Sequence, residues 1–196
     1  METKQAENTT QPQEIPKLTA LVLEKFPGRV TARHTCLGDE TITIPREGML
    51  EVFAFLRDDK HCRFNLMVDL TAVDYLGLRE TRFELVVHLK SLALGHRLRV
   101  KIPVPAEDPS VDSLINLWGA VDWYERECFD MYGLIFKNHP NLKRLILYDS
   151  FVGHPLRKDY PIHLQQPRVT LRPVRERYDY MCRVMKDPSE TEQPPL

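Results

Sequence analysis

The chain has 196 residues and a formal net charge of −1, and it is 42% hydrophobic and 28% charged. This length and composition are typical of a soluble globular protein with one self-sufficient core. No apolar run approaches the roughly 20 residues of a membrane-spanning helix, so we expect membrane attachment only through partners. The first residues resemble neither a secretory signal nor a transit peptide, and we interpret the chain as a bacterial cytoplasmic protein.

The amino-terminal part predicts two helices and a hairpin, from apolar spacing and from the positions of proline and glycine. Residues 1–15 are polar and predict a disordered or partner-ordered arm. The elements predicted after this arm are a helix opened by Pro16 and ended by Pro27-Gly28, strands near 30–36 and 40–44 joined by a turn at Gly38-Asp39, and a helix from Pro45 to about Asp58 that carries Leu50, Phe53, Ala54 and Phe55.

Three segments, 63–71, 82–90 and 97–104, alternate apolar and polar residues. A period of two over this length predicts half-buried strands, with Leu66 and Val68 on the buried face of the first. The second and third are expected to pair in antiparallel fashion, because their connection is short. For the basic residues of the polar face we favour a solubilising role over a docking surface. They are Arg63, Arg82, Arg97, Arg99 and Lys101.

The second half of the chain predicts two helices and one further regular segment. A short helix is expected after a turn-rich break, capped by Ser110 or Asp112. A longer helix is predicted from about residue 121 to 131, and Gly133 ends it. Beyond that glycine, only residues 142–148 have the pattern of regular structure.

These elements predict one α+β (α/β) domain over residues 16–163, with a mostly antiparallel or mixed sheet flanked by helices. An extended basic segment over 164–196 follows, which we expect to wrap a partner, with its last ten residues disordered. Residues 137–186 hold eleven Lys or Arg against four acids. So basic a region needs an anionic partner surface or is a solvated face, and the sequence leaves both open.

Cysteine and glycine spacing argues against the commonest cofactor sites. Cys36, Cys62, Cys128 and Cys182 form no CxxC pair, and we interpret them as reduced thiols, not as ligands of zinc or an iron–sulfur cluster. The eight glycines are never closer than ten positions apart, so the chain has neither a GxGxxG motif nor a Walker-type phosphate loop.

The stretch Glu125–Pro161 densely mixes acids, bases, histidines, prolines and aromatics. Its histidines, together with His163, match no common metal-ligand spacing. We interpret His139-Pro140 and His154-Pro155 as histidines in fixed turns that hydrogen-bond to backbone or carboxylate. A ligand or proton-transfer role is the alternative.

Acid–base catalysis is a second candidate, through the helical carboxylates Glu125, Glu127 and Asp130. Asp122, Arg126 and Asp130 follow at intervals of four, which predicts one Arg between two carboxylates. We expect neighbouring bases to neutralise the acids, which favours a structural network over catalysis. Nucleic-acid binding lacks a recognised motif, so a protein-binding surface remains, since Arg and aromatics are common interface anchors. The neutralising bases are expected to be Arg126, Lys143, Arg144, Arg157 and Lys158.

The same residues carry a family resemblance. The chain closely resembles the C subunit (the "30 kDa" subunit family) of proton-pumping NADH:quinone oxidoreductase, respiratory complex I. The match is a long, ordered and specific string within residues 118–161, and the domain before it is similar over about residues 16–118. The matching residues are Trp118, Gly119, Glu125, Arg126, Glu127, Asp130, Gly133, Leu134, Ile135, Phe136, His139, Pro140, Lys143, Arg144, Gly153, His154, Pro155, Leu156, Arg157, Lys158, Asp159, Tyr160 and Pro161.

The resemblance implies a non-catalytic subunit of the peripheral, hydrophilic arm, on the cytoplasmic side of the bacterial inner membrane. It implies no catalytic, cofactor-binding or metal residue on this chain, with FMN, iron–sulfur clusters and quinone on partner subunits and no nucleic acid. The implied neighbours in complex I are the D subunit, which helps form the quinone pocket, and the B subunit, which holds the last cluster. We name them the quinone-pocket subunit and the cluster-bearing subunit. Our hypothesis makes Glu125–Pro161 both an internally paired network and the dock for the quinone-pocket subunit.

Other assignments stay open at this point. The first is an equivalent subunit of a related membrane-bound hydrogenase or another donor-linked complex that uses the same module. In a different class, the chain is a stand-alone enzyme or a nucleic-acid binder. Neighbouring genes separate the first from NADH:quinone oxidoreductase, and a substrate turned over by the purified chain identifies the second.

Overall fold

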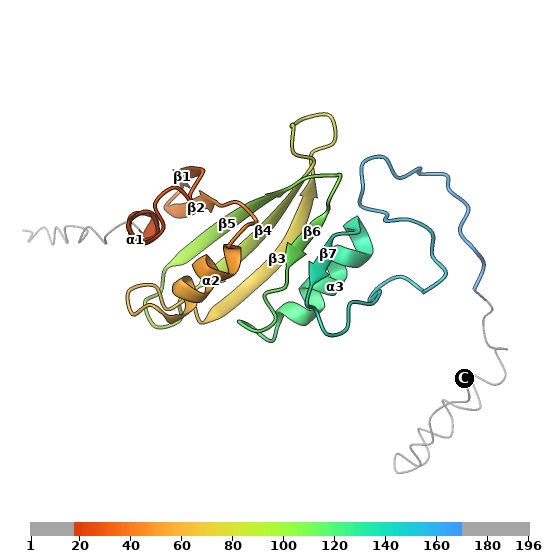
Figure 1. Ribbon diagram of the computed structural model, residues 1–196. Coiled ribbons are helices and arrows are strands. Elements are labelled where there is room, and N and C mark those ends of the chain that lie inside the picture. The colour runs from red at the N-terminus through yellow and green to blue at the C-terminus, as the bar shows by residue number, and fades with distance from the viewer. Residues whose placement is uncertain (1–17, 170–196) are drawn as a thin grey trace, which may run out of the picture. The chain divides into compact units, whose positions relative to one another are not determined.

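The computed structural model describes residues 18–169, and within them a five-stranded sheet lies beside helices (Figure 1). Residues 18–162 belong to one compact unit, and a second unit begins at His163. The described architecture confirms the predicted α+β class with a mixed sheet. In chain order the elements are α1 Leu18–Lys25, β1 Ala32–Cys36, β2 Asp39–Thr43, α2 Met49–Asp58, β3 Leu66–Asp74, β4 Phe83–Lys90, β5 Arg97–Val104, β6 Ser110–Asp112, α3 Val121–Tyr132 and β7 Ile135–Lys137.

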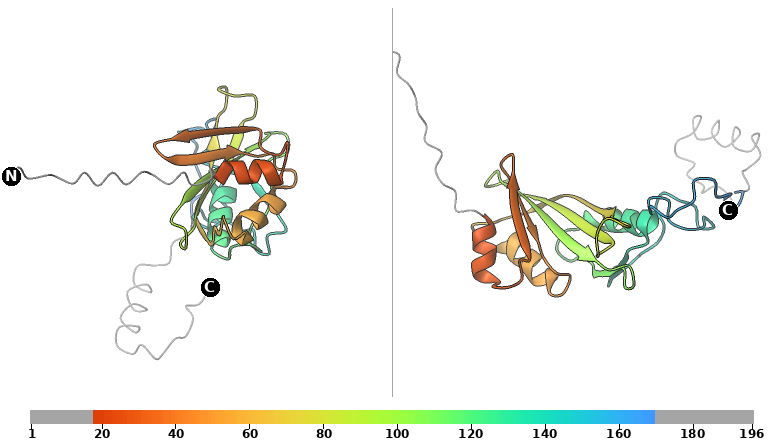
Figure 2. Two further views of the ribbon diagram at one scale, coloured as in Figure 1. Left: turned by 90° about the vertical axis from the view of Figure 1, so that its left-hand side faces the viewer. Right: turned by 90° about the horizontal axis from the view of Figure 1, so that it is seen from above.

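The large sheet has the strand order β1-β2-β5-β4-β3. Its neighbours are antiparallel except β2 and β5, which run parallel. Helices α1 and α2 lie on one side of the sheet (Figure 2), and the buried apolar side chains of both helices join those of the strands in one core. The predicted β1–β2 hairpin is confirmed; its turn residues Leu37 and Gly38 both have positive φ, 52° and 86°.

The alternation predicted for β5 is confirmed, but in β3 it is out of phase. A bulge between Met67 and Asp69 adds a residue to β3 opposite β4. As a result Met67 and Leu70 face the core, whereas Leu66 and Val68, which the pattern placed inside, are exposed. Periodicity alone cannot detect such an insertion, because one extra residue reverses the face of every residue before it.

Strand β4 is buried on both faces, not on one as predicted. Glu84 lies on the predicted polar face and is buried, with Arg79 Nη1 at 2.8 Å and Lys101 Nζ at 2.9 Å from its carboxylate. Lys101, interpreted from the sequence as a solubilising residue, therefore forms an internal ion pair. A buried carboxylate needs such partners because desolvation penalises its charge.

Helix α2 starts at Met49, four residues later than predicted, after Gly48 in the left-handed region (φ 73°). The helix turns a different face to the core than expected, since Leu50 is exposed. Met49, Val52, Phe53 and Leu56 are its buried residues.

Two predictions for the second half are wrong. Residues Ser110–Asp112 form strand β6 instead of starting a helix, and β6 pairs in parallel with β7. Residues 142–148 contain neither helix nor strand. The β6–β7 pairing joins residues about 25 positions apart in sequence, which local spacing does not report.

Helix α3 packs along β3, the last strand of the sheet, and covers its edge. Tyr124 Oη donates to the carbonyl of Val68 (3.2 Å), and Cys128 Sγ lies 3.7 Å from the carbonyl of Leu70. These contacts satisfy acceptors that an edge strand leaves unpaired, and they fix the position of α3 against the sheet. The predicted end of the helix at Gly133 is confirmed, with φ 74° and its N–H bonded to the carbonyl of Phe129.

Candidate functional site

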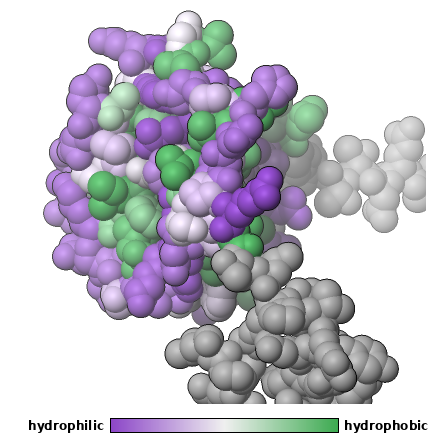
Figure 3. Space-filling view, turned by 90° about the vertical axis from the view of Figure 1, so that its right-hand side faces the viewer, coloured by the Kyte–Doolittle hydropathy of each residue, from purple (hydrophilic) through white to green (hydrophobic). Residues whose placement is uncertain are grey.

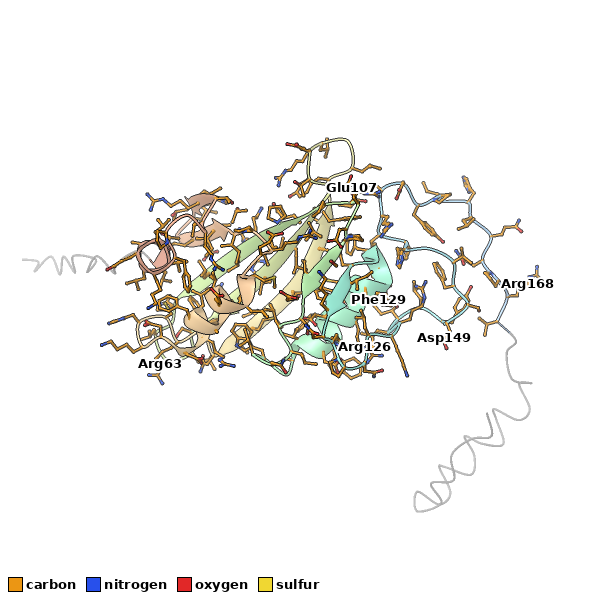
Figure 4. All side chains as sticks on the ribbon, in the orientation of Figure 1. Arg63, Glu107, Arg126, Phe129, Asp149 and Arg168 are labelled. Atoms are coloured by element: carbon orange, nitrogen blue, oxygen red, sulfur yellow. The ribbon has the colours of Figure 1, made fainter. Side chains whose placement is uncertain are left out.

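The signature segment (Glu125–Pro161) comprises most of α3, strand β7 and a long irregular stretch that we name the loop segment (residues 138–161). Figure 4 labels Arg126 and Phe129 on α3 and Asp149 on the loop segment. Because the loop segment has no regular secondary structure, its backbone N–H and C=O groups need hydrogen-bond partners other than those of a helix or sheet. The signature segment packs on three carboxylates with fully buried side chains, Asp74, Glu125 and Asp130, of which Asp74 and Asp130 bind backbone N–H groups of the loop segment.

Asp130, on α3, binds the backbone of the loop segment. Its Oδ2 accepts the N–H groups of Leu145 (3.0 Å), Ile146 (2.8 Å) and Leu147 (2.8 Å), and its Oδ1 pairs with Arg144 Nη1 at 2.7 Å. Burial acts to raise the pKa of Asp130, but these hydrogen bonds outweigh it and hold that pKa below its usual range. Asp130 is therefore an ionised carboxylate with all its strong acceptor sites occupied.

Arg144 extends this arrangement along the loop segment. Its Nη2 donates to the carbonyls of Phe151 (3.0 Å) and Gly153 (3.3 Å), so one guanidinium joins α3 to a later part of the loop segment. The prediction that Arg126 sits between two carboxylates is wrong. Arg126 instead donates to the carbonyls of Lys143 and Arg144, both at 3.2 Å, and the base that pairs with Asp130 comes from the loop.

The carboxyl end of α3 is capped by side chains from the loop segment. Arg157 Nε donates to the carbonyl of Tyr132 (2.5 Å), and His154 Nδ1 lies 2.9 Å from the carbonyl of Asp130. Burial lowers the pKa of His154, although the bond to the Asp130 carbonyl opposes this, so His154 serves as a neutral donor. A Cβ on Gly133 would lie 2.6 Å from both Arg157 Nη2 and His154 Nε2, which explains the glycine at this position.

Asp74, at the end of β3, anchors the far end of the loop segment. Arg82 binds it through two nitrogens, at 3.1 and 2.9 Å, and the same guanidinium reaches Asp159 Oδ1 at 2.7 Å. The backbone N–H of Lys158 donates to Asp74 Oδ2 (2.8 Å). These hydrogen bonds lower the pKa of Asp74 against the opposing effect of burial. Arg82, interpreted from sequence as a solubilising residue, is thus a bridge between the sheet and the loop segment.

Glu125 differs from the other two buried carboxylates. The prediction that Lys or Arg side chains neutralise it is wrong: Ser113 Oγ lies 2.6 Å from Oε2 and the Leu114 N–H donates to Oε1 at 2.7 Å. His139 Nε2 lies 4.0 Å from Glu125 Oε2, and that nitrogen lies 3.1 Å from Asp122 Oδ1. Burial raises the pKa of Glu125 to about 7.

The remaining predicted residues lie at the periphery of this network. Gly153 and Tyr160 approach each other closely, since a Cβ on Gly153 would lie 3.0 Å from the Tyr160 ring. Tyr160 stacks on Phe151 with ring centroids 6.2 Å apart. His163 belongs to the second unit, and Cys182 lies outside the described residues. The exposed members of the predicted set are Glu127, Pro140, Lys143, Lys158, Asp159 and Pro161, and Pro155 is half-buried.

Apolar side chains of the same region point outwards, which the sequence reasoning missed. Ile146 is 62% exposed, Leu156 48% and Trp123, on α3, 59%. Figure 3 views the molecule from the side of the loop segment, and apolar groups lie there among hydrophilic ones. We name Ile146, Leu156 and Trp123 the apolar outer residues. The sequence does contain a signal for this arrangement. Where closely spaced acids and bases pair with one another, the apolar residues between them have no hydrophobic core to pack into and remain exposed.

Other features of the described residues do not coincide with the predicted site. A cleft of about 560 Å³ borders β3, β4 and β5 and is lined in part by Leu66, Asp69, His88, Arg97 and Arg99. No cluster of three or more His, Cys, Asp or Glu suited to a metal ion occurs among residues 18–169. Within that same range, no helix is both long and apolar enough to cross a membrane.

Comparison with known proteins gives a family match over most of this region. The family model described as "Respiratory-chain NADH dehydrogenase, 30 Kd subunit" matches residues 42–166. A protein of Citrifermentans bemidjiense, named as the C subunit of NADH-quinone oxidoreductase, is 52% identical over 125 residues, covering 64% of this chain and 76% of that protein. A protein of the same name from Rhodobacter capsulatus is 42% identical over 176 residues, covering 86% and 87%.

A solved structure shares the fold at lower identity. It is a chain from the structure titled "membrane-bound sulfane sulfur reductase (MBS), an archaeal respiratory membrane complex". The similarity has a TM-score of 0.62 and 21% identity, and it covers 90% of this chain and 94% of that one. At this identity the likeness concerns the fold alone.

Proposed function

The chain belongs to the family of the respiratory-chain NADH dehydrogenase 30 Kd subunit, and from this premise we propose that it is a non-catalytic, structural subunit of the peripheral arm of NADH:quinone oxidoreductase. The resemblance expected from the signature residues is thereby confirmed. The complex passes electrons from NADH through FMN and iron–sulfur clusters to quinone and couples this to proton translocation. In this proposal those cofactors are bound by partner subunits, and this chain contributes shape and contacts.

One observation carries the structural role. Asp130, Arg144 and Arg157 of the signature segment are directed at one another or at backbone groups, and the apolar outer residues face solvent. A loop of this length held rigidly, with large apolar side chains outside, is typical of a surface that a partner covers. The hypothesis of an internal network that also docks a partner is therefore refined: the charges shape the loop and the apolar outer residues make the contact.

We propose the quinone-pocket subunit as the partner on this surface, with the cluster-bearing subunit nearby. The family assignment supports a place in a multi-subunit complex. Attachment to the cytoplasmic face of the inner membrane then comes through the other subunits. The specific neighbours rest on the family resemblance of the signature residues and are the part of the proposal that an experiment must decide.

The archaeal respiratory membrane complex supplies a second candidate, because one of its chains has the same fold. In this alternative the chain is the equivalent subunit of a related membrane-bound complex with another electron donor. The relatives named as NADH-quinone oxidoreductase subunits are 42% and 52% identical to this chain, against 21% here, which favours the first candidate.

Co-purification tests the proposal. The full chain, tagged and expressed at its native level, is isolated from gently solubilised membranes, and the proteins that accompany it are identified. We expect the subunits of NADH:quinone oxidoreductase, with quinone reduction driven by NADH in the isolated material. Hydrogenase subunits in their place would support the second candidate. A chain recovered alone would contradict both.

A further inference from the structure

A cluster of three ionisable side chains lies between α3 and the turn after β7. The side chains of Glu125 and His139 are fully buried, and Asp122 is 34% exposed but turns its Oδ1 inwards. His139 Nε2 lies 3.1 Å from Asp122 Oδ1 and 4.0 Å from Glu125 Oε2. Neither that nitrogen nor Asp122 Oδ1 has a well-directed hydrogen-bond partner among the described residues. Such a pair of buried polar atoms is uncommon in folded proteins.

The turn after β7 fixes the protonation state of His139. The backbone N–H of Asn141 donates to His139 Nδ1 at 3.0 Å, so this nitrogen must keep its lone pair. The ring therefore carries a proton on Nε2, which faces the two carboxyl groups. A second proton on the ring would sit on Nδ1 and break the Asn141 bond. His139 Nε2 is thus held as a donor that faces the carboxyl groups of Asp122 and Glu125.

Glu125 is the member whose ionisation the surroundings oppose. No Lys or Arg among residues 18–169 forms an ion pair with Glu125 or Asp122. Burial raises the pKa of Glu125, the hydrogen bonds from Ser113 and Leu114 oppose the rise, and the charge of Asp122 adds to it. The Cys128 thiol, one turn further along α3, has a pKa raised first by burial and also by the negative charges of Glu127, Asp69 and Glu125.

We propose that Glu125 is a buried protonation switch that holds α3 to strands β6 and β7 when it is neutral and weakens this attachment when it ionises. The carboxyl group bridges α3 to Ser113 and Leu114, just after β6, and in the neutral form this bridge places no charge in the interior. In the ionised form, Glu125 places a negative charge in the interior, beside His139 and the inward-facing Oδ1 of Asp122. Either the new charge stays uncompensated, or His139 takes up a proton and the Asn141 N–H loses its acceptor. Both outcomes loosen the same junction.

The sign of the pH dependence follows from the direction of the shift. The folded protein holds the Glu125 proton up to a pKa of about 7, against an ordinary value of 4.5. Between these two pH values Glu125 is protonated in the folded state and ionised in the unfolded state. The contribution of this proton to folding stability is therefore complete below pH 4.5 and is lost as the pH rises through about 7. In this window the folding equilibrium constant falls by at most roughly tenfold per pH unit, and the effect levels off above it.

Unfolding of the full-length chain in urea, followed from about pH 5 to about pH 8, tests the switch. Compared with Glu125→Gln, the wild type should lose stability as the pH rises to about 7, and the difference between the two proteins should then level off. Glu127→Gln is the matched control, because Glu127 is exposed on the same helix and should leave the slope unchanged. Equal slopes in the wild type and Glu125→Gln would overturn the proposal.

Carbon-13 NMR of the side-chain carboxyl groups gives a second measurement that does not require a stable Glu125 variant. We expect one glutamate of the wild type to titrate near pH 7, and Asp122→Asn to move that midpoint to lower pH by removing the neighbouring charge. The response to Asp122→Asn also assigns the signal if Glu125→Gln does not fold. A wild type in which every glutamate titrates near 4.5 would refute the switch.

Discussion

At the scale of single residues, Asp130 has the largest structural role in the signature segment. It is fully buried and accepts four hydrogen bonds from the loop segment, three from backbone N–H groups and one from Arg144. An irregular stretch of chain cannot satisfy these groups by a ladder, so one carboxylate replaces several missing backbone bonds. The sequence indicated that these charges would pair. It did not indicate that Asp130 would pair with Arg144 instead of Arg126.

Asp130→Asn should destabilise the protein by about 3–5 kcal/mol, because it leaves the buried Arg144 guanidinium without its counter-charge. Urea unfolding monitored by tryptophan fluorescence measures this loss. Asp149→Asn serves as the control, since Asp149 is exposed on the same loop segment and should change stability by about 0.5 kcal/mol or less. Similar values for the two variants would contradict the role assigned to Asp130.

Gly133 makes a second prediction at this scale. Gly133→Ala should cost about 1–3 kcal/mol, because φ is 74° and the new Cβ would meet Arg157 and His154 at 2.6 Å. Gly119→Ala is the matched control, since Gly119 has no neighbour within 4 Å of the added carbon and no positive φ. The same unfolding experiment compares the two variants. An unchanged stability in Gly133→Ala would show that the loop segment does not pack tightly against the carboxyl end of α3.

At the scale of elements, spacing in the sequence predicted what is local. The β1–β2 hairpin, the alternation of β5 and the end of α3 at Gly133 follow from a few neighbouring residues each. The bulge in β3 and the pairing of β6 with β7 depend on distant partners, and no local pattern records them. The burial of β4 on both faces was not predicted for the same reason, because it depends on the ion pairs of Glu84 with Arg79 and Lys101.

In the candidate site, too, local features could be predicted from the sequence and features that depend on distant residues could not. The signature residues identified the family and the existence of an internally paired network, since acids and bases in such numbers need partners. The exception, Glu125, could not be recognised from sequence, because its lack of a basic partner depends on how α3 meets β6 and β7. Likewise, the sequence could not predict which apolar residues face outwards. The hydrogen bond to Asp130 fixes the backbone of Ile146 and leaves its side chain in solvent.

At the scale of the whole molecule, our proposal gives separate roles to the charges, which shape the loop segment, and to the apolar outer residues, which contact the partner. Arg144→Glu should impair assembly of the peripheral arm by releasing the loop segment, since it reverses the charge opposite Asp130. NADH oxidation by a detached flavin module should be unaffected, which separates assembly from electron input. A normal yield of quinone-reducing complex from this variant would contradict the prediction.

The apolar outer residues allow the contact to be tested without disturbing the network. In the double variant Ile146→Gln with Leu156→Gln, each backbone hydrogen bond of these positions remains available, including that from Ile146 to Asp130. The isolated chain should therefore unfold within about 1 kcal/mol of the wild type. Leu37→Gln is the control, because Leu37 is equally apolar and fully exposed on the β1–β2 turn.

The most direct test of docking through the apolar outer residues is the amount of the quinone-pocket subunit that co-purifies with the tagged full chain from native membranes. We predict recovery close to that of the wild type for Leu37→Gln and a loss of about tenfold or more for the double variant, as expected for hot-spot side chains. Undiminished recovery of the quinone-pocket subunit with the double variant, at wild-type folding stability, would show that the partner binds elsewhere.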